Sequence, residues 1–384
     1  MDDAGARAAT LLARHRPGYA LERELYADAG LFELELERIW HAGWLFAAHS
    51  GELRRPGARV ALDVGDEPVV VVRQHDGSVR AFHNVCRHRG SVVAGAGVGA
   101  LLVCPYHRWS YDLDGSLRSC PGAPEDVDRA ALALGELAAL EAGGLVLVSL
   151  STVPPDASGW CEALNAAPEA ASLARAKVAA RVEYEIAADW KLVWENNREC
   201  LHCVSNHPQY VPSNFDVVRS GDTVPGGLAE FPDSEGSAWW SETRAALRPP
   251  YVTESMDGLP VAPPLGAAGP GVGRAETWRL RMLPSFWAHV SADHAVTTRV
   301  LPAGPDRTRA VVSWLVDPEA VEGTDYDLDR LMPFWRLTSE QDWAICERQQ
   351  RGVRSRAYRP GPLSPQLETN VANFHAWYAD RLRA

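Results

Sequence analysis

The sequence predicts an α+β protein with two domains, an all-β module followed by a larger domain of helices and one antiparallel sheet. With 384 residues, the chain is long enough for two buried cores. Short β-runs between turn signals fill residues 58–151, and a Pro/Ala-rich connector follows at 153–171. We therefore expect a helical lead-in at 1–45 that packs on the second domain, the all-β domain at 46–155 and the second domain at 156–384.

Residues 20–49 are predicted to be helical. Apolar residues recur there at helical spacing, with acidic residues between them. The preceding Ala/Arg-rich stretch at 1–16 lacks the apolar core and cleavage pattern of a signal peptide. The longest apolar runs, such as 144–150, are far too short to span a membrane. We expect a soluble cytoplasmic protein with no membrane partner.

Charge and cysteine content narrow the class of protein. The net charge of −12 comes without a basic run, which argues against nucleic acid or an anionic membrane as a partner. The seven cysteines are odd in number and unevenly spread, which argues against a disulfide framework. We expect some of them to bind metal and the others to be buried.

The remaining elements follow from apolar periodicity. An irregular region at 208–274 interrupts the second domain, and a loop region of that length is typical of a lid or pocket wall. A long amphipathic helix is predicted at 327–352, with Leu328, Leu331, Phe334 and Leu337 on its buried stripe. The predicted strands are 59–64, 68–73, 145–149, 182–186, 275–283, 286–291, 295–301 and 308–315, and the predicted turns are 75–77 and 112–115.

Two Cys/His pairs form the first candidate metal site. Cys86 and His88 follow one β-run, and Cys104 and His107 follow another, so two loops can present four ligands toward one point. Such a set can hold zinc, or a [2Fe–2S] cluster with cysteines on one iron and histidines on the other. A zinc finger would place its histidines together on a helix. The mixed pairs in a β-rich module favour the cluster.

The second candidate site contains Glu199, His202 and His207. Glu199 and His202 would share one face of a helix, because side chains three residues apart are neighbours. Pro208 biases His207 away from helical geometry, so the helix can end and turn the second imidazole back toward the first. Two imidazoles and a carboxylate from elsewhere would form the facial triad that holds non-haem Fe(II). Alone, this spacing is weak evidence.

Residues 84–90 (NVCRHRG) and 104–109 (CPYHRW) resemble the Rieske domain of the Rieske non-haem iron oxygenase α subunits, and the resemblance covers most of the chain. It implies an N-terminal Rieske [2Fe–2S] domain, with Cys86, His88, Cys104 and His107 as cluster ligands. A catalytic domain of the helix-grip type would follow. One departure is Arg108, where the family more often has glycine.

The same resemblance implies a mononuclear iron held by His202, His207 and Asp342. Residues 189–192 (DWKL) and 195–197 (ENN) precede the histidines as in the family, and 339–343 (SEQDW) supplies the late acidic ligand. Glu340 and Glu347 are the alternatives to Asp342, and we interpret them as solvated helix charges. Cys200 and Cys203 look like a redox pair, but we expect them to pack around the iron-binding helix, because the βαβ setting of such a pair is missing.

Glu199 occupies a position where the family more often has aspartate. The resemblance implies that this acid carries electrons from the cluster of one subunit to the iron of its neighbour, which predicts a homotrimer. A carboxylate there would also fix the tautomer of a ligating histidine. An ordinary helix salt bridge is the alternative role. The chain shows no dinucleotide-binding fingerprint. We therefore expect electrons from NAD(P)H through a separate flavin/iron–sulfur reductase, with or without a ferredoxin, and O₂ as co-substrate.

Residues 195–208, 346–352, 358–362 and 374–377 resemble the glycine betaine, stachydrine and carnitine oxygenases. This implies N-demethylation of a quaternary ammonium compound. The alternatives are oxygenation of another small amine or nitrogen heterocycle, including at nitrogen, and hydroxylation of an aromatic ring. Outside these enzymes, an electron carrier or a zinc-stabilised binding protein remains open. Aromatic faces suit a quaternary cation, and the candidate pocket residues are Trp239, Trp240, Trp278, Trp287, His289, Asp293 and His294.

Overall fold

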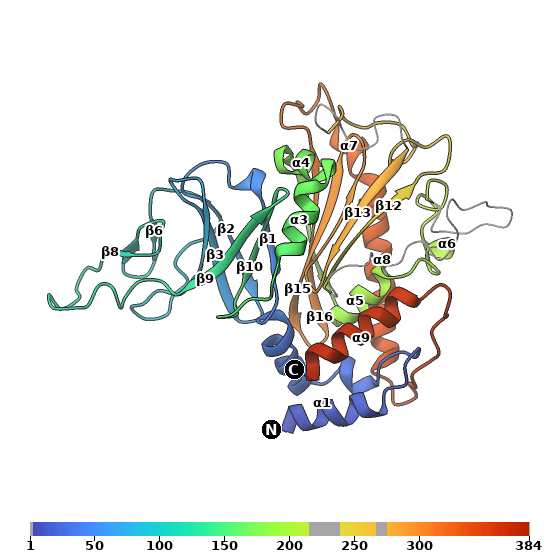
Figure 1. The fold of residues 1–384 in the computed structure, drawn as a ribbon, viewed down its shortest axis with the longest axis horizontal. Coiled ribbons are helices and arrows are strands. Elements are labelled where there is room, and N and C mark those ends of the chain that lie inside the picture. The colour runs from blue at the N-terminus through green and yellow to red at the C-terminus, as the bar shows by residue number, and fades with distance from the viewer. Residues whose placement is uncertain (1–2, 215–238, 266–274, 384) are drawn as a thin grey trace. The chain divides into compact units, whose positions relative to one another are not determined.

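The computed structural model describes residues 3–214, 239–265 and 275–383. The chain divides into two compact units (Figure 1). The β unit is Trp40–Asn165, and the mixed unit combines Met1–Ile39 with Ala166–Ala384. The N-terminal helices thus belong to the same unit as the C-terminal part of the chain. We keep 46–155 and 156–384 as the proposed limits of the two functional domains.

The β unit contains ten strands in its described residues. They are β1 (Leu45–His49), β2 (Ala58–Val64), β3 (Glu67–Arg73), β4 (Val79–His83), β5 (Gly97–Val98), β6 (Leu102–Val103), β7 (Ser110–Tyr111), β8 (Leu117–Ser119), β9 (Glu136–Ala142) and β10 (Leu145–Ser149). Seven of them form one sheet in the order β1-β10-β9-β4-β3-β2-β5, and β6-β7-β8 form a second. The all-β module is confirmed.

Both predicted turns of the β unit are confirmed. The turn between β3 and β4 is closed by a hydrogen bond from Gln74 N to Ser78 O, with Gly77 in a left-handed conformation at φ 87°. Gly115 closes the second turn at φ 82°, and a Cβ there would lie 2.5 Å from the Phe82 ring. A side chain at position 115 therefore meets both an unfavourable φ and a ring in the core.

The mixed unit is built on a six-stranded antiparallel sheet in the order β11-β16-β15-β14-β13-β12. Its strands are β11 (Lys177–Ile186), β12 (Trp240–Ala246), β13 (Glu276–Met282), β14 (Phe286–Val290), β15 (Ala295–Gly304) and β16 (Arg307–Val316). Its described α-helices are α1 (Asp3–Arg14), α2 (Ala29–Glu35), α4 (Pro168–Arg175), α5 (Trp190–Asn197), α6 (Cys203–Asn206), α7 (Leu328–Leu331), α8 (Pro333–Val353) and α9 (Thr369–Arg383). Helix α3 (Ser158–Ala166) belongs to the β unit except for its last residue. Helix α5 contacts β15, β16 and α8, and α8 also contacts β11 (Figure 1). A long helix against an antiparallel sheet is the predicted architecture.

Several local predictions were wrong. The lead-in at 20–49 is not all helix, because Leu45–His49 pairs with β10 as a strand. The connector at 153–171 contains α3 and the first half of α4. The region at 208–274 contains β12, and its parts at 215–238 and 266–274 lie outside the described residues. Leu337 is 40% exposed rather than buried, because the buried stripe of α8 continues from Phe334 through Thr338 instead.

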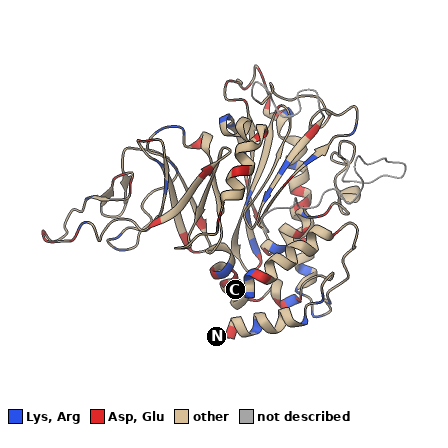
Figure 2. Ribbon diagram, viewed as in Figure 1, with Lys and Arg blue, Asp and Glu red and all other residues tan. Residues whose placement is uncertain are grey.

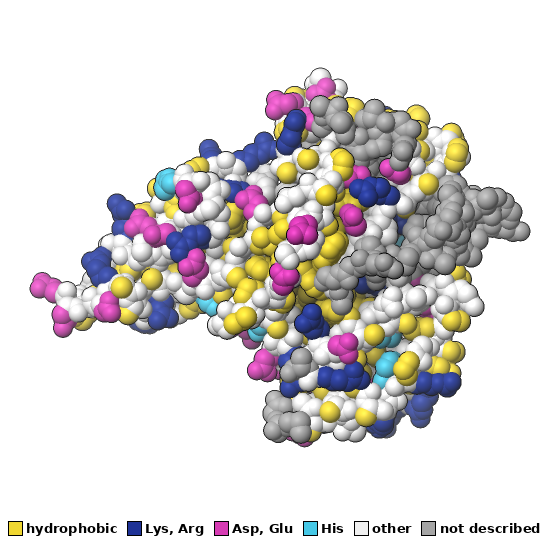
Figure 3. Space-filling view, in the orientation of Figure 1, with side chains coloured by type: hydrophobic (Ala, Val, Ile, Leu, Met, Phe, Trp, Pro, Cys, Tyr) yellow, Lys and Arg dark blue, Asp and Glu magenta, His cyan; other side chains and the backbone are white. Residues whose placement is uncertain are grey.

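Acidic and basic side chains are interspersed along both units (Figure 2). On the face shown in Figure 3, side chains of the two signs also alternate over the described residues. Although the net charge of the chain is −12, the described part of that face therefore has no large patch of a single sign.

A buried charge cluster fixes the start of α5. Lys191 Nζ lies 2.7 Å from Glu35 Oε1 and 2.9 Å from Asp189 Oδ2, and Asp189 also caps α5 by accepting a hydrogen bond from Lys191 N. The Tyr378 hydroxyl donates to Glu35 at 2.6 Å. Burial lowers the pKa of Lys191, but Asp189 and Glu35 raise it more, so the ammonium stays charged. The cluster joins α2, α5 and α9.

Replacing Lys191 with methionine is expected to destabilise the mixed unit by about 3–5 kcal/mol, because Glu35 and Asp189 would be left buried without their cation. Urea unfolding followed by circular dichroism measures the effect. The control is Arg330→Met, which removes an exposed ion pair with Asp257 and should cost no more than about 1 kcal/mol. Similar unfolding midpoints for the two variants would contradict the prediction.

Candidate functional site

The histidine segment follows α5 but is not a continuation of it. Helix α5 ends at Asn197, residues 198–202 form a turn, and α6 starts at Cys203. The prediction that Glu199 and His202 lie on one helix was wrong, but their contact is present, with Glu199 Oε1 2.6 Å from His202 Nδ1. The turn brings the side chains of Glu199 and His202 as close together as one turn of helix would have done.

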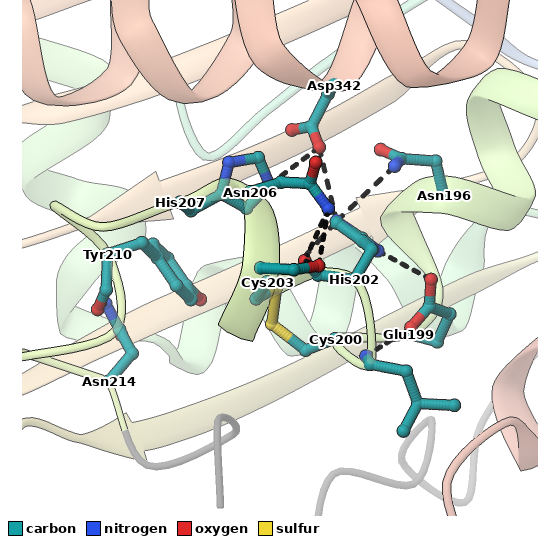
Figure 4. Close-up of a disulfide and its surroundings, with 12 residues drawn as sticks. Asn196, Glu199, Cys200, His202, Cys203, Asn206, His207, Tyr210, Asn214 and Asp342 are labelled. Atoms are coloured by element: carbon teal, nitrogen blue, oxygen red, sulfur yellow. Dashed lines mark hydrogen bonds and ion pairs between the residues drawn. A yellow bond between two sulfur atoms is a disulfide. The ribbon is translucent and has the colours of Figure 1, made fainter. Parts of the chain in front are cut away.

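His202, His207 and Asp342 converge on one point (Figure 4). Asp342 Oδ1 lies 3.2 Å from His202 Nε2 and 2.9 Å from His207 Nε2. The two imidazole rings lie 5.2 Å apart and nearly perpendicular, at 87°. His207 follows α6 and leaves helical geometry before Pro208, with φ −121° and ψ 72°, as expected from the proline. Helix α8 brings Asp342 to the histidines from 135 residues away.

Each histidine is held at its other nitrogen. Glu199 faces Nδ1 of His202, and Gln341 Oε1 lies 2.8 Å from Nδ1 of His207. Gln341 in turn accepts a hydrogen bond from Gln209 Nε2 at 2.9 Å. Acceptors at both Nδ1 atoms hold a proton there, so Nε2 is the nitrogen that each ring turns toward Asp342 and would offer to a metal ion once its own proton is lost. Sequence reasoning missed Gln341, although it stands next to Asp342.

The pKa values of the group reflect this mutual contact. Burial lowers the pKa of His202, but hydrogen bonds to Asp342 and Glu199 raise it more, to about 10. Burial raises the pKa of Asp342, and the two histidines more than offset this, so that it lies below its usual value. A carboxylate that stays ionised between two imidazoles is a ready site for a dication.

Cys200 and Cys203 form a disulfide. The prediction that they only pack around the iron segment was wrong, because the turn at 198–202 brings their Cα atoms within 5.0 Å, which is inside the range for a disulfide. Cys203 Sγ also lies 3.8 Å from His202 Nε2. The other cysteines, Cys86, Cys104, Cys120, Cys161 and Cys346, are free.

The two alternative carboxylates are engaged elsewhere. Glu340 is exposed and pairs with Arg336 one turn earlier on α8 at 2.9 Å. Glu347 Oε1 accepts a hydrogen bond from the backbone of Ala187 at 3.1 Å. Glu340 is the solvated helix charge that was predicted, whereas that prediction was wrong for Glu347, which is half-buried and bonded to a residue outside α8.

A cavity of 520 Å³ opens beside the triad. Of the predicted pocket residues, Trp287 and His289 line it. Trp278 is buried and donates to Glu242, and Asp293 is buried against His294, so these three do not line the cavity. Trp239 and Trp240 are also absent from its wall.

Sequence reasoning missed other residues of the cavity wall. Arg279 and Arg281 stand two apart on β13, and Trp335 and Trp343 stand on the face of α8 that carries Asp342. The alternation in a strand and the spacing of seven or eight in a helix could have pointed to them. The other lining residues include Tyr210, Thr298, Thr338, Ser339 and parts of residues 365–370.

The first predicted site lies in two loops of the β unit. Cys86 and Cys104 are buried, at 3% and 1% exposure, whereas His88 is exposed and His107 half-buried. The two imidazole rings lie 4.8 Å apart. Burial raises the pKa of Cys104, but the backbone N–H groups of Tyr106 and His107 and contact with Cys86 lower it more. Two inward thiols and two outward imidazoles fit a [2Fe–2S] cluster with different ligands on its two irons.

Arg108 stands in the second loop with φ 64°, a left-handed conformation that favours glycine. This explains why glycine is the commoner residue in the family it resembles. The Arg108 side chain is exposed.

Comparison with known proteins decides the family. The family model for the Rieske [2Fe-2S] domain matches residues 43–139, and the model for the ring hydroxylating alpha subunit (catalytic domain) matches residues 173–384. The chain belongs to the Rieske oxygenase α subunits. The predicted family, fold class and enzyme class of this oxygenase are thereby confirmed.

Individual relatives agree with this. Over its whole length the oxygenase is 37% identical to the glycine betaine monooxygenase oxygenase subunit of Chromohalobacter salexigens, of which it covers 91%. It is 26% identical to the chloroplastic choline monooxygenase of Beta vulgaris, over 93% of this chain and 76% of that one. A solved quaternary ammonium Rieske monooxygenase, studied for carnitine oxidation and inter-subunit electron transfer, superposes with a TM-score of 0.76 at 23% identity, covering 97% of both chains.

In the described part of the oxygenase, none of the helices combines the length and apolar character needed to cross a membrane.

Proposed function

We propose that the oxygenase removes an N-methyl group from a quaternary ammonium compound. The observation that carries the proposal is the cavity in which His202, His207 and Asp342 face aromatic side chains from three segments, namely Tyr210, Trp287, Trp335 and Trp343. A quaternary ammonium has no N–H to donate, so aromatic faces are the natural way to bind it. The glycine betaine and choline monooxygenases among the relatives support the substrate class.

We assign the mononuclear iron to His202, His207 and Asp342, and the cluster to Cys86, His88, Cys104 and His107. Two imidazole nitrogens and a carboxylate oxygen suit Fe(II) and leave room for other ligands. When bound, the iron would supply oxygen activation, and the cluster would supply electrons from NAD(P)H through a separate flavin/iron–sulfur reductase, with or without a ferredoxin.

The protein groups then have defined tasks. The aromatic faces hold the cation with one methyl group toward the triad. Glu199 and Gln341 fix the imidazoles. Glu199 is only partly buried, so it can also meet a cluster histidine of the neighbouring subunit, and we propose that it bridges electron transfer within a cytoplasmic homotrimer. The chemistry consumes O₂, two electrons and two protons and gives a hydroxymethyl ammonium and water. Loss of the hydroxyl proton then cleaves the C–N bond and releases formaldehyde and the tertiary amine.

The decisive test is a substrate screen with purified oxygenase, reductase, NADH and O₂, scored by formaldehyde release. We expect formaldehyde from at least one N-methyl quaternary compound, in proportion to NADH consumed. Oxidised heterocycle or ring products without any formaldehyde would overturn the proposal. Metal analysis separates the other classes: cluster iron alone indicates an electron carrier, and zinc alone a binding protein.

Tyr111 is expected to tune the cluster. Its hydroxyl accepts from Arg87 N at 3.0 Å and lies 3.4 Å from Cys86 Sγ. Burial, together with Cys86, raises the pKa of Tyr111, so the hydroxyl keeps its proton and donates it to the sulfur. Replacing Tyr111 with phenylalanine should lower the reduction potential by roughly 40 mV, the equivalent of one hydrogen bond of about 1 kcal/mol.

A redox titration followed by visible circular dichroism measures this potential. The matched control is Tyr106→Phe, since Tyr106 is exposed and contacts Arg89 rather than a cysteine. An equal shift in the two variants, or none in Tyr111→Phe, would refute the assignment.

A further inference from the structure

Cys203 lies within the candidate metal site as well as beside it in the sequence. Its Sγ is 3.8 Å from Nε2 of His202, the nitrogen that also contacts Asp342. The sulfur and one ring nitrogen from each of His202 and His207 all lie within 4.8 Å of one another (Figure 4). Ligand atoms around one tetrahedral zinc ion are roughly 3–4 Å apart, because the bonds are about 2.0–2.3 Å long. A small inward movement of these side chains would therefore bring all three atoms to one ion.

Cys203 keeps this position through contacts that do not involve the disulfide. The residue is only 4% exposed and packs with Tyr210 and Phe334. Its N–H donates a hydrogen bond to Cys200 O at 3.3 Å, and its carbonyl accepts one from His207 N at 2.9 Å. Opening the sulfur–sulfur bond should therefore leave the Cys203 thiol next to the triad.

The redox state of the Cys200–Cys203 disulfide determines whether this sulfur can bind a metal ion. A disulfide sulfur carries no charge, whereas a thiolate is the form of cysteine that acts as a metal ligand. A dithiol reductant opens the bond by supplying two electrons and two protons, and it becomes a disulfide itself. When a metal ion then binds, the Cys203 thiol releases its proton to water. Reduction thus supplies the site with one additional anionic ligand.

The two redox forms offer different sets of ligands. With the disulfide closed, the triad supplies two imidazoles and one carboxylate, the set that leaves positions open on Fe(II). With the disulfide open, Cys203 adds a thiolate, and the four donors are then of the kinds that zinc takes in a closed tetrahedral site. Zinc also ranks above Fe(II) in general affinity for nitrogen, oxygen and sulfur ligands. Reduction should therefore favour zinc at the triad.

We propose that reduction of the Cys200–Cys203 pair turns the triad into a zinc site, with Cys203 as an additional ligand. In the oxidised form, the disulfide withholds this sulfur and the site stays open for iron. Disulfides of cytoplasmic proteins are usually transient and catalytic or redox-sensing. The inference rests on the proposed use of the triad as a metal site and is independent of the substrate.

Two single variants separate the sulfur from the disulfide. Cys200→Ser and Cys203→Ser both abolish the disulfide, but only Cys200→Ser leaves a thiol next to His202. Each protein is purified without oxygen, freed of mononuclear iron and given one equivalent of zinc, and its visible spectrum confirms that the cluster is intact. Zinc-edge X-ray absorption should show one sulfur at about 2.3 Å in Cys200→Ser. Cys203→Ser and the oxidised wild type should show only nitrogen and oxygen, at about 2.0–2.2 Å.

Competition with a chelator measures the zinc affinity of the same proteins. Cys200→Ser should bind zinc at least about 100-fold more tightly than Cys203→Ser, because a direct ligand contributes more than an outer hydrogen-bond partner does. Equal affinities, or a shell without sulfur in Cys200→Ser, would overturn the inference and leave the triad as a metal site. If none of the proteins bound zinc or mononuclear iron, the proposed triad itself would be refuted.

The wild-type protein decides if either variant fails to fold. A phosphine reductant opens the disulfide and is removed before zinc is added, so that it cannot bind the metal itself. Sulfur should enter the zinc shell only after this treatment, and the zinc affinity should rise with it. An identical shell before and after reduction would contradict the proposal.

Discussion

Replacing Asp342 with alanine is expected to remove the mononuclear iron and abolish product formation while the cluster stays in place. Asp342 Oδ1 contacts the Nε2 atoms of both His202 and His207, so its loss takes away one ligand and the charge that orients the other two. Product formation should fall by more than the roughly 100-fold typical of losing an outer hydrogen-bond partner. Iron analysis with the visible spectrum of the cluster, and formaldehyde release, measure the two effects.

The matched control is Glu340→Ala on the same helix. Glu340 is exposed and pairs with Arg336, so its removal should change neither iron content nor turnover. If Asp342→Ala kept its mononuclear iron and Glu340→Ala lost it, the ligand assignment would be wrong.

Replacing Glu199 with glutamine is expected to leave both metal centres bound but to reduce coupled product formation by roughly 10–100-fold. Glutamine can still accept a hydrogen bond from His202 Nδ1, where Glu199 now lies at 2.6 Å, but it carries no charge to draw that proton during electron transfer. The measurement is the rate at which a reduced cluster is reoxidised in the presence of substrate and O₂, together with formaldehyde formed per NADH.

Glu199→Asp supplies the comparison, because it keeps the charge and should recover much of the rate. If Glu199 only orients His202, glutamine and aspartate should be tolerated about equally. Full coupled turnover in Glu199→Gln would therefore refute the electron bridge.

Local patterns predicted much of the fold. Alternating β-branched residues marked strands such as Val182–Ile186 and Ala295–Leu301, which lie in β11 and β15. β12 was missed because its sequence, WSETRAA, is largely polar. Its polar residues are matched by distant partners, with Glu242 accepting from Trp278 and Arg244 paired with Glu169 of α4. Such partners are not visible in a strand's own sequence.

The candidate site, like the fold, was predicted only in part. The spacing of Glu199, His202 and His207 predicted their approach, but a turn satisfies it as well as a helix does, so the break after Asn197 was missed. Arg279 and Arg281 stand in a strand that was predicted, yet which face of that strand borders the cavity depends on the packing of α8. The periodicity of a sequence identifies the two faces of a strand or helix, but tertiary packing determines which face lines the site.

Helix α8 carries Asp342, the proposed iron ligand, and Gln341, the partner that orients His207, and these residues lie 135 and 134 positions after His207 in the chain. The proposed iron-binding set therefore does not exist until the chain has closed that long loop, and the entropy of closure is lost before a metal can bind. By mass action, any ion that binds only the closed form stabilises it, by about 2.7 kcal/mol at a hundred times its dissociation constant. Iron supply and the folding yield of the mixed unit are thus thermodynamically linked. Cells short of iron would then lose this enzyme through unfolding as well as through inactivity.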